Sequence, residues 1–185
     1  MKQAIGLLIA ALGMSACGQS DEQHNKEQAE SHSVKTEVPA KGNYQPEVTV
    51  VKYEDLLQVL SQKNDTLNIV NFWATWCVPC VKELPHFVAT AAEMSNKPVK
   101  LILVSLDTRS SLDSAVIPFI KDKNFVARHY LLDDNGRMNE WIPKIDAKWD
   151  GAIPATALYK NGQKLRFDQG QLSESELKTN IQTHL

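Results

Sequence analysis

Short apolar runs recur along the chain from about residue 47 onward, and turn-forming residues separate them. Their β-branched and aromatic content is typical of strands. Leu67–Trp73 is apolar except at Asn68 and Asn71, which indicates a strand buried on both faces. Asn161-Gly162 between the last two runs favours a hairpin turn. Strands are predicted at residues 48–51, 67–73, 99–106, 126–132, 155–160 and 164–168.

Between these runs, apolar residues recur with the period of a helix. Tyr53, Leu56, Leu57 and Leu60 stand at positions i, i+3, i+4 and i+7, so they share one helical face. Further helices are predicted over residues 80–91, over 112–120, around 141–142 and from 173 onward. Strands that alternate with helices, followed by a hairpin and a last helix, predict an α/β domain over residues 47–185, with a mixed central β-sheet flanked by helices.

Helix starts carry their own signals. Ser173 with Glu176 three residues later predicts a capping box at the last helix, and Ser110 with Asp113 predicts another. Pro118 lies inside the helix predicted over residues 112–120 and has no backbone N–H to donate. A kinked or late-starting helix is therefore expected there.

The first sixteen residues have the organisation of a secretory signal peptide. Ile5–Met14 forms its apolar region, shorter than a membrane-spanning helix requires, and Ser15-Ala16 provides the small residues of a cleavage site. Cys17 follows at once, and Leu12–Cys17 resembles a bacterial lipoprotein box, although Met14 stands where leucine is usual. We expect Cys17 to carry the lipid. The alternative is an ordinary signal peptide with an incidental cysteine.

Residues 17–46 are rich in polar side chains and contain no aromatic residue before Tyr44. Such a stretch cannot bury enough apolar surface to offset the entropy lost on ordering, so we expect a flexible tether to a lipid membrane. His24 and His32 have no partner at ligand spacing and are expected to be solvated. The net charge of the chain is only −2, so no nucleic acid partner is expected.

Two of the three cysteines stand in Cys77-Val78-Pro79-Cys80, which begins four residues after the end of the apolar run at residue 73. Cys80 shares the apolar face of the following helix, whereas Cys77 lies at its first turn, where unpaired N–H groups and the helix dipole favour a thiolate. We therefore predict a redox-active dithiol with Cys77 as nucleophile and Cys80 as resolving thiol. Lipidation of Cys17 would leave no unpaired cysteine.

The segment Phe72–Cys80 resembles the active-site motif of the thioredoxin superfamily, and Ala152–Thr156 is similar to its cis-proline loop. The resemblance covers about residues 47–185 and implies a thioredoxin-like fold. The export signal, the tether and residues 107–150 resemble the membrane-anchored extracytoplasmic thiol-disulfide reductases (the TlpA/ResA-like group) related to cytochrome c maturation proteins.

Glu83 matches an acidic residue that this group carries near its dithiol, whereas Asn71 stands where thioredoxin has a buried aspartate. A carboxylate that assists Cys80 is therefore expected at Glu83, one helical turn away, where it can accept the Cys80 proton if it is partly buried. The alternative is that Glu83 is a solvated residue on the helix surface.

Substrate contacts are expected around the dithiol, at Trp76, Val78, Pro79, Ile153 and Pro154. The resemblance implies that Pro154 lies across from Cys77, where an extended substrate chain can add a short β-type pairing. Trp73 is expected in the core and His86 on the surface, and Trp149 is assigned to the rim or to the core with equal weight.

Three functions fit the dithiol. The first is reduction of disulfides in exported proteins, with apocytochrome c among the candidate substrates, and it requires a membrane thiol donor because the compartment is oxidising. The second is the reverse reaction, introduction of disulfides, since the direction depends on how well the Cys77 thiolate is stabilised. The third is carriage of a soft metal by the two thiolates, for which no histidine or third sulfur stands at ligand spacing.

The first function is the one we expect, in a periplasmic or extracytoplasmic protein anchored to the membrane through Cys17. No cofactor and no bound metal are expected. A peroxidase is disfavoured, because the chain lacks the threonine–cysteine pattern of that clan. The sequence leaves open the substrate, the reduction potential, the choice of inner or outer membrane and the oligomeric state.

Overall fold

The computed structural model describes residues 44–185. The expected signal peptide (1–16), the lipidated Cys17 and nearly all of the tether lie outside these described residues. They stay predictions.

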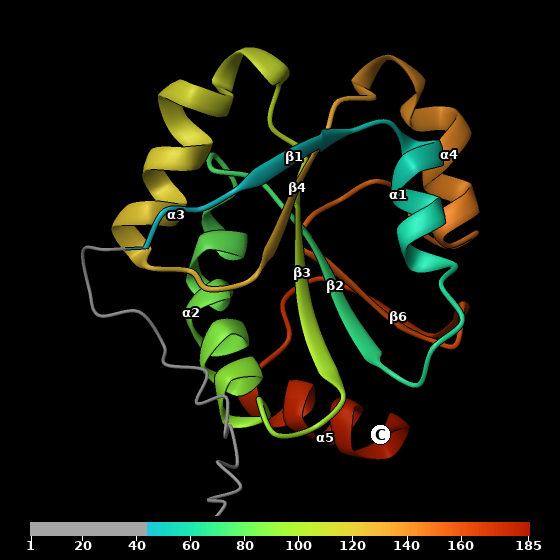
Figure 1. Cartoon of the computed structure of the whole chain (residues 1–185). Helices are drawn as coiled ribbons and strands as arrows, with labels where there is room; N and C mark the ends of the chain where they lie inside the picture. Colours follow the sequence, from blue (N-terminus) through green and yellow to red (C-terminus); the bar gives the residue numbers. More distant parts are fainter. Residues whose placement is uncertain (1–43) are drawn as a thin grey trace, which may run out of the picture. The chain divides into compact units, whose positions relative to one another are not determined.

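Residues 44–185 form one mixed six-stranded sheet with the strand order β1-β4-β3-β2-β5-β6 (Figure 1). The strands are β1 (Val48–Val51), β2 (Leu67–Trp73), β3 (Val99–Ser105), β4 (Arg128–Leu132), β5 (Ala155–Lys160) and β6 (Gln163–Gln169). The first four run parallel, and β5 and β6 are antiparallel to their neighbours. The predicted α/β class with a mixed sheet is confirmed. Since β1 to β4 are parallel, their carboxyl ends share one edge of the sheet, where ligand and active sites of such sheets are commonly found.

Five α-helices cover the two faces of this sheet: α1 (Tyr53–Leu60), α2 (Val78–Glu93), α3 (Ile117–Lys123), α4 (Met138–Ile145) and α5 (Glu174–His184). Helices α2, α3 and α5 pack on one face and α1 and α4 on the other (Figure 1). Successive side chains of β2 point to opposite faces of the sheet and so contribute to both hydrophobic cores. Ile69 and Trp73 face the layer of α2, α3 and α5, and Val70 and Phe72 face the layer of α1 and α4. As predicted, β2 is therefore a strand buried on both faces.

The capping box at Ser173 and Glu176 is confirmed, because each residue's side chain accepts a hydrogen bond from the other's backbone N–H. The capping box at Ser110 and Asp113 is wrong. Ser110 bonds Thr108 through its hydroxyl instead, and no side-chain cap forms there.

The region before α3 explains this failure. The chain makes a 3₁₀ turn at Arg109–Ser111 and a π turn at Leu112–Val116 before α3 begins at Ile117. Pro118 lies in the first turn of α3, where its missing N–H leaves no intrahelical bond unmade. The prediction of a late-starting helix is thus confirmed.

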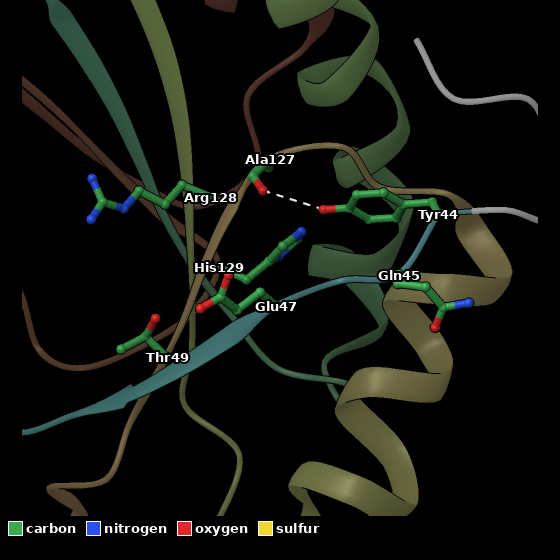
Figure 2. A pocket seen from close by; sticks show the side chains of 7 residues that line it. All are labelled: Tyr44, Gln45, Glu47, Thr49, Ala127, Arg128 and His129. Atoms are coloured by element: carbon green, nitrogen blue, oxygen red, sulfur yellow. Dashed lines mark hydrogen bonds between the residues drawn. The ribbon is translucent and has the colours of Figure 1, made fainter.

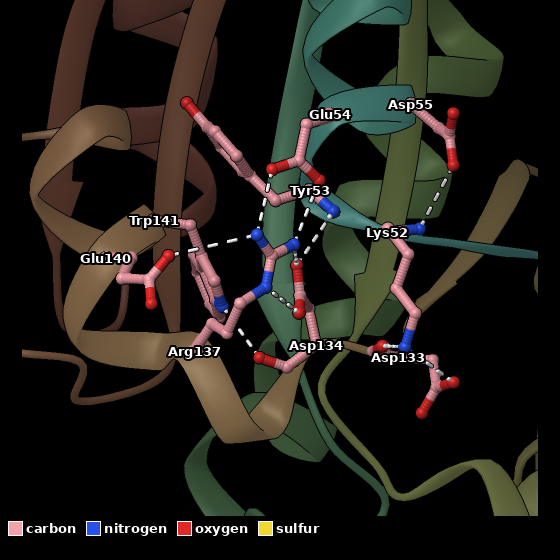
Figure 3. Close-up of polar contacts among 9 residues, drawn as sticks. All are labelled: Lys52, Tyr53, Glu54, Asp55, Asp133, Asp134, Arg137, Glu140 and Trp141. Atoms are coloured by element: carbon pink, nitrogen blue, oxygen red, sulfur yellow. Dashed lines mark hydrogen bonds and ion pairs between the residues drawn. The ribbon is translucent and has the colours of Figure 1, made fainter.

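Arg137 ties the start of α1 to the β4–α4 connection (Figure 3). Its two terminal nitrogens donate to the carboxylate of Glu54 at 3.0 and 2.9 Å, and Nε and Nη2 donate to Asp134 at 2.9 and 2.6 Å. Asp134 also accepts the backbone N–H of Tyr53, and its carbonyl accepts the indole N–H of Trp141. One guanidinium thus fixes two segments that are more than eighty residues apart in sequence.

We expect Arg137→Met to lower the melting temperature by a few degrees, because it removes a network rather than a single exposed ion pair. The loss should shrink in about 1 M salt, which screens exposed charges. Glu140→Gln is the matched control, since Glu140 lies 3.8 Å from the same guanidinium in an exposed pair. Equal melting temperatures for Arg137→Met and the unmodified protein would contradict a stabilising role.

Candidate active site

The dithiol stands where β2 passes into α2, at the carboxyl edge of the parallel strands. Cys77 is the residue that caps the amino end of α2, and its Sγ accepts the backbone N–H of Cys80 at 3.3 Å. A disulfide joins Cys77 to Cys80, with 5.3 Å between their Cα atoms, so the structure holds the oxidised form. Pro79 lies in the first turn of α2, where a residue without an N–H leaves no bond unmade.

Both sulfurs are covered in this form. The exposed fraction is 5 % for Cys77 and 0 % for Cys80, so the more accessible of the two is the predicted nucleophile by a small margin. Trp76 and Val78 beside it are 67 % and 64 % exposed. They are two of only four large hydrophobic side chains exposed among residues 44–185, which makes the rim of the dithiol an unusual apolar surface.

The second segment of the site precedes β5. The peptide bond between Ile153 and Pro154 is cis, which confirms the cis-proline loop implied by the resemblance. The carbonyl oxygen of Ile153 lies 3.7 Å from the Sγ of Cys77. The carbonyl of Pro154 accepts a hydrogen bond from the backbone N–H of Gly170 at 2.8 Å, which fixes the proline in place. The carbonyl of Ile153 thus lies against Cys77, next to the cis bond of Pro154, and the role of these two residues as substrate contacts stays a prediction.

Glu83 is 1 % exposed, so the alternative of a solvated surface residue is wrong. Its carboxylate accepts the side-chain amide of Asn71 at 2.8 Å and the backbone N–H of Leu172 at 3.0 Å. Burial raises the pKa of Glu83 to about 7, and the two hydrogen bonds lower it only in part. Glu83 lies one turn beyond Cys80 on the same helix, the spacing at which helical side chains are neighbours. A buried carboxyl group with a raised pKa thus lies one helical turn from Cys80, the predicted resolving thiol.

A third segment, residues 170–172, closes over the start of α2. Gln171 donates from Nε2 to the Pro79 carbonyl at 2.9 Å, and the Leu172 carbonyl lies 2.9 Å from Nε2 of His86. His86 is half-buried, so it is only partly the surface histidine expected from the sequence. The segment before α5 therefore holds both the dithiol loop and Glu83 in place.

Trp73 and Trp149 both lie in the core. Trp73 is 0 % exposed, as expected. Trp149 is 4 % exposed and packs its ring against Phe72 and Trp141, with ring centroids 4.8 and 5.7 Å away. Its indole N–H donates to the carbonyl of Ala152 at 2.8 Å. Trp149 therefore supports the loop before Pro154 from within and does not form the rim.

Sequence reasoning missed several groups that meet at this edge. Leu172 contributes only backbone atoms to Glu83, so no residue type could reveal it. Thr156 accepts the amide of Asn71 at 3.1 Å, and Asp107 binds the loop before Cys77. The available signal for Asp107 was a polar residue that directly follows a buried parallel strand.

A separate hollow of about 440 Å³ is lined by Tyr44, Gln45, Glu47, Thr49, Ala127, Arg128 and His129 (Figure 2). It lies at the amino ends of β1 and β4, the edge of the sheet opposite to the dithiol. Burial lowers the pKa of His129 to about 4, and one ring nitrogen lies 2.8 Å from the Phe125 carbonyl. This hollow is thus separate from the redox site.

Two further features are absent from residues 44–185. No group of three or more His, Cys, Asp and Glu side chains in this range is placed to hold a metal ion. None of the helices in the same range is both long enough and apolar enough to cross a membrane.

Known proteins resemble this chain at the level of sequence. The thiol-disulfide oxidoreductase ResA of Oceanobacillus iheyensis is 35 % identical over 111 residues, which cover 59 % of this chain and 52 % of that protein. The sporulation thiol-disulfide oxidoreductase A of Bacillus subtilis is 36 % identical over 70 residues, 38 % of this chain and 42 % of that protein. The chain thus spans about half the length of these relatives.

Solved structures agree on the fold. A thioredoxin-family thiol:disulfide interchange protein from Chlorobium tepidum superposes with a TM-score of 0.55 at 19 % identity, over 69 % of this chain and 83 % of that one. This likeness shows a thioredoxin-like fold. The model of one protein family, AhpC/TSA, matches residues 42–167 and so takes in β1 through most of β6, the dithiol and the cis-proline loop. With more than half of its length inside that match, the chain belongs to the AhpC/TSA family.

Proposed function

We propose that this chain is a thiol-disulfide oxidoreductase that reduces disulfides of exported proteins. One observation carries the proposal: Cys77 and Cys80 form a disulfide at the start of α2, beside a buried carboxyl group whose pKa burial raises to about 7. The names of the relatives, ResA and sporulation thiol-disulfide oxidoreductase A, support the same reaction class.

The reaction begins from the reduced protein. The Cys77 thiolate attacks one sulfur of the substrate disulfide, so a mixed disulfide forms and the other substrate sulfur leaves as a thiolate. Cys80 then loses its proton and attacks the Sγ of Cys77. The second substrate sulfur leaves, and the Cys77–Cys80 disulfide seen in the structure is the product. Two electrons have passed to the substrate, and a membrane dithiol donor restores them.

Glu83 is the proposed acceptor of the Cys80 proton. A buried thiol ionises reluctantly, so a base within one helical turn lowers the barrier to its attack. Since burial raises the pKa of Glu83 to about 7, the group is partly ionised near neutral pH and can both take up and release a proton there. Asn71 and Leu172 orient the carboxylate through their hydrogen bonds.

The substrate chain is proposed to bind across the apolar rim around Cys77. Trp76 and Val78 are exposed there and provide apolar contact area. Ile153 and Pro154 lie on the other side of the sulfur. Pro79 holds the turn between the two cysteines. Apocytochrome c is one candidate for a substrate that reaches this rim with its own pair of cysteines.

The place of action is proposed from the sequence alone. A signal peptide over residues 1–16 exports the chain, lipid on Cys17 anchors it to a membrane, and the rest of 17–46 tethers the domain of residues 47–185. The protein then works in the periplasm or another extracytoplasmic space.

The reduction potential tests the direction of electron flow. Equilibrated in dithiothreitol buffers, the Cys77–Cys80 pair is expected near the ~ −270 mV of a reductant such as thioredoxin. The protein with dithiothreitol should also accelerate reduction of insulin disulfides. A potential near the ~ −120 mV of a strong oxidant would instead assign the chain to disulfide introduction.

A further inference from the structure

Asp107 is a buried carboxylate that the proposed mechanism does not use. It lies two residues after Ser105, the last residue of β3, and is 2 % exposed. Its Oδ2 accepts the backbone N–H of Thr75 at 2.9 Å and the hydroxyl of Ser105 at 2.7 Å. Its Oδ1 accepts the hydroxyl of Thr75 at 2.6 Å. Three donated hydrogen bonds are close to the capacity of an ionised carboxylate, so the contacts suit the charged form.

All of these donors are electrically neutral. Among residues 44–185, no Lys, Arg or His side chain lies within ion-pair distance of Asp107. The negative charge is therefore oriented by dipoles and is not cancelled by a cation. A buried charge of this kind acts over a longer range than a solvated one, because the surroundings screen it weakly.

The charge lies close to the place where the Cys77 thiolate forms. Thr75 stands two residues before Cys77, a stretch of chain that spans at most about 7 Å. Both the backbone and the hydroxyl of Thr75 are bound to Asp107, and the N–H of Cys77 donates to the Ala74 carbonyl at 3.1 Å. The loop that carries the nucleophile is thus fixed directly to the carboxylate.

We propose that Asp107 positions the Thr75–Cys77 loop and that its charge makes the dithiol a stronger reductant. This inference rests on the proposed redox function of Cys77 and Cys80. The helix N-terminus stabilises the Cys77 thiolate, whereas the Asp107 carboxylate repels it. The balance between the two sets how readily the protein gives up its electrons.

The repulsion acts on one side of the redox equilibrium only. When a dithiol donor reduces the protein, the S–S bond breaks and two electrons enter. Cys77 becomes a thiolate and Cys80 a thiol, while the donor becomes a disulfide and one proton is released to water. The oxidised pair carries no charge, so Asp107 disfavours only the reduced product. Its carboxylate therefore makes the potential more negative.

Asp107→Asn tests the charge, since it keeps the shape and an oxygen acceptor for Thr75. We expect the equilibrium with dithiothreitol to move about tenfold toward the reduced protein, which equals a potential about 30 mV less negative. Alkylation of Cys77 by iodoacetamide should also begin at a lower pH. An unchanged potential together with an unchanged alkylation profile would overturn the proposal.

Thr75→Val is the matched control for loop position. It deletes one hydroxyl donor to the carboxylate but keeps the charge, so the exchange equilibrium should move no more than about twofold, and toward the oxidised protein, while insulin reduction slows. A tenfold shift toward the reduced protein in Thr75→Val would show that loop geometry, and not charge, sets the potential.

Ser105→Ala decides the question if circular dichroism shows that Asp107→Asn does not fold. Removing the Ser105 hydroxyl leaves the carboxylate less neutralised, so the equilibrium should move about twofold toward the oxidised protein. No shift, or a shift toward the reduced protein, would overturn the proposal. These comparisons between variants do not depend on the direction of electron flow. A wild-type protein that fails to reduce insulin would count against the proposed function alone.

Discussion

Cys77→Ser is expected to abolish the reduction of insulin disulfides. A serine hydroxyl is not ionised near neutral pH and does not exchange with disulfides, so no mixed disulfide can form at position 77. Cys80 cannot take over, because it is 0 % exposed in the first turn of α2. The measurement is the rate of insulin reduction with dithiothreitol as donor. Turnover above the rate without protein in Cys77→Ser would contradict the assignment of Cys77 as nucleophile.

Cys80→Ser is the matched variant and has the opposite signature. Cys77 can still attack, but the mixed disulfide cannot be resolved, so covalent complexes with substrate should accumulate. Non-reducing gel electrophoresis detects them, and the same variant expressed in cells captures the natural substrates. If Cys77→Ser were the variant that trapped partners, the two roles would be exchanged.

Glu83→Gln is expected to slow resolution of the mixed disulfide about 10²-fold at pH 7, the lower end of the range for general base catalysis. Because burial raises the pKa of Glu83 to about 7, the wild-type rate should climb as pH rises through 7 and the carboxyl group ionises. In the variant this climb should vanish, and only the rise due to ionisation of the thiol itself, near pH 8.5 or above, should remain. Rapid-mixing measurement of thiol release from a preformed mixed disulfide gives both profiles.

Glu93→Gln serves as the control, since Glu93 is an exposed carboxylate at the end of the same helix, paired with Lys178. It should leave the profile unchanged. A pH profile of Glu83→Gln that coincides with that of the wild type would reduce Glu83 to a structural role.

The raised pKa of Glu83 also links it to stability. Its folded pKa of about 7 lies above the ordinary 4.5, so it favours the folded state while protonated, and this contribution is lost as pH rises from 4.5 through 7. The loss is on the order of 3 kcal/mol at most. His129, with a pKa lowered from 6.5 to about 4, acts in the opposite direction between those values. The difference between Glu83→Gln and wild type at each pH isolates the Glu83 contribution.

Much of the fold was predictable because its signals are local. β2 and β5 have the predicted bounds, since each is a largely apolar run next to turn-forming residues. The start of α3 was predicted only in part, because Pro118 signals a break but not the π turn that precedes it. Leu57 fits the apolar helical spacing and is nevertheless 40 % exposed, since the spacing does not show how wide a stripe the core covers.

Site residues close together in the sequence were predictable, whereas contacts between distant residues were not. Cys77, Cys80 and Glu83 lie within seven residues of one another and could be named from the motif and the helical period. Asp107 meets Thr75 across 32 residues, and Leu172 meets Glu83 across 89. These contacts depend on the order of strands in the sheet and on a backbone N–H that every residue type except proline carries. Local sequence patterns therefore do not predict these contacts.

The distance along the chain between Glu83 and Leu172 has a consequence for maturation. Cys77 and Cys80 are three residues apart, so an oxidant can join them as soon as their turn is made. Glu83 obtains one of its two hydrogen bonds from Leu172, 89 residues later in the chain, so its folded environment is complete only when the segment before α5 is in place. The disulfide is a local feature of the α2 turn, whereas the environment that raises the pKa of Glu83 requires the C-terminal part of the domain.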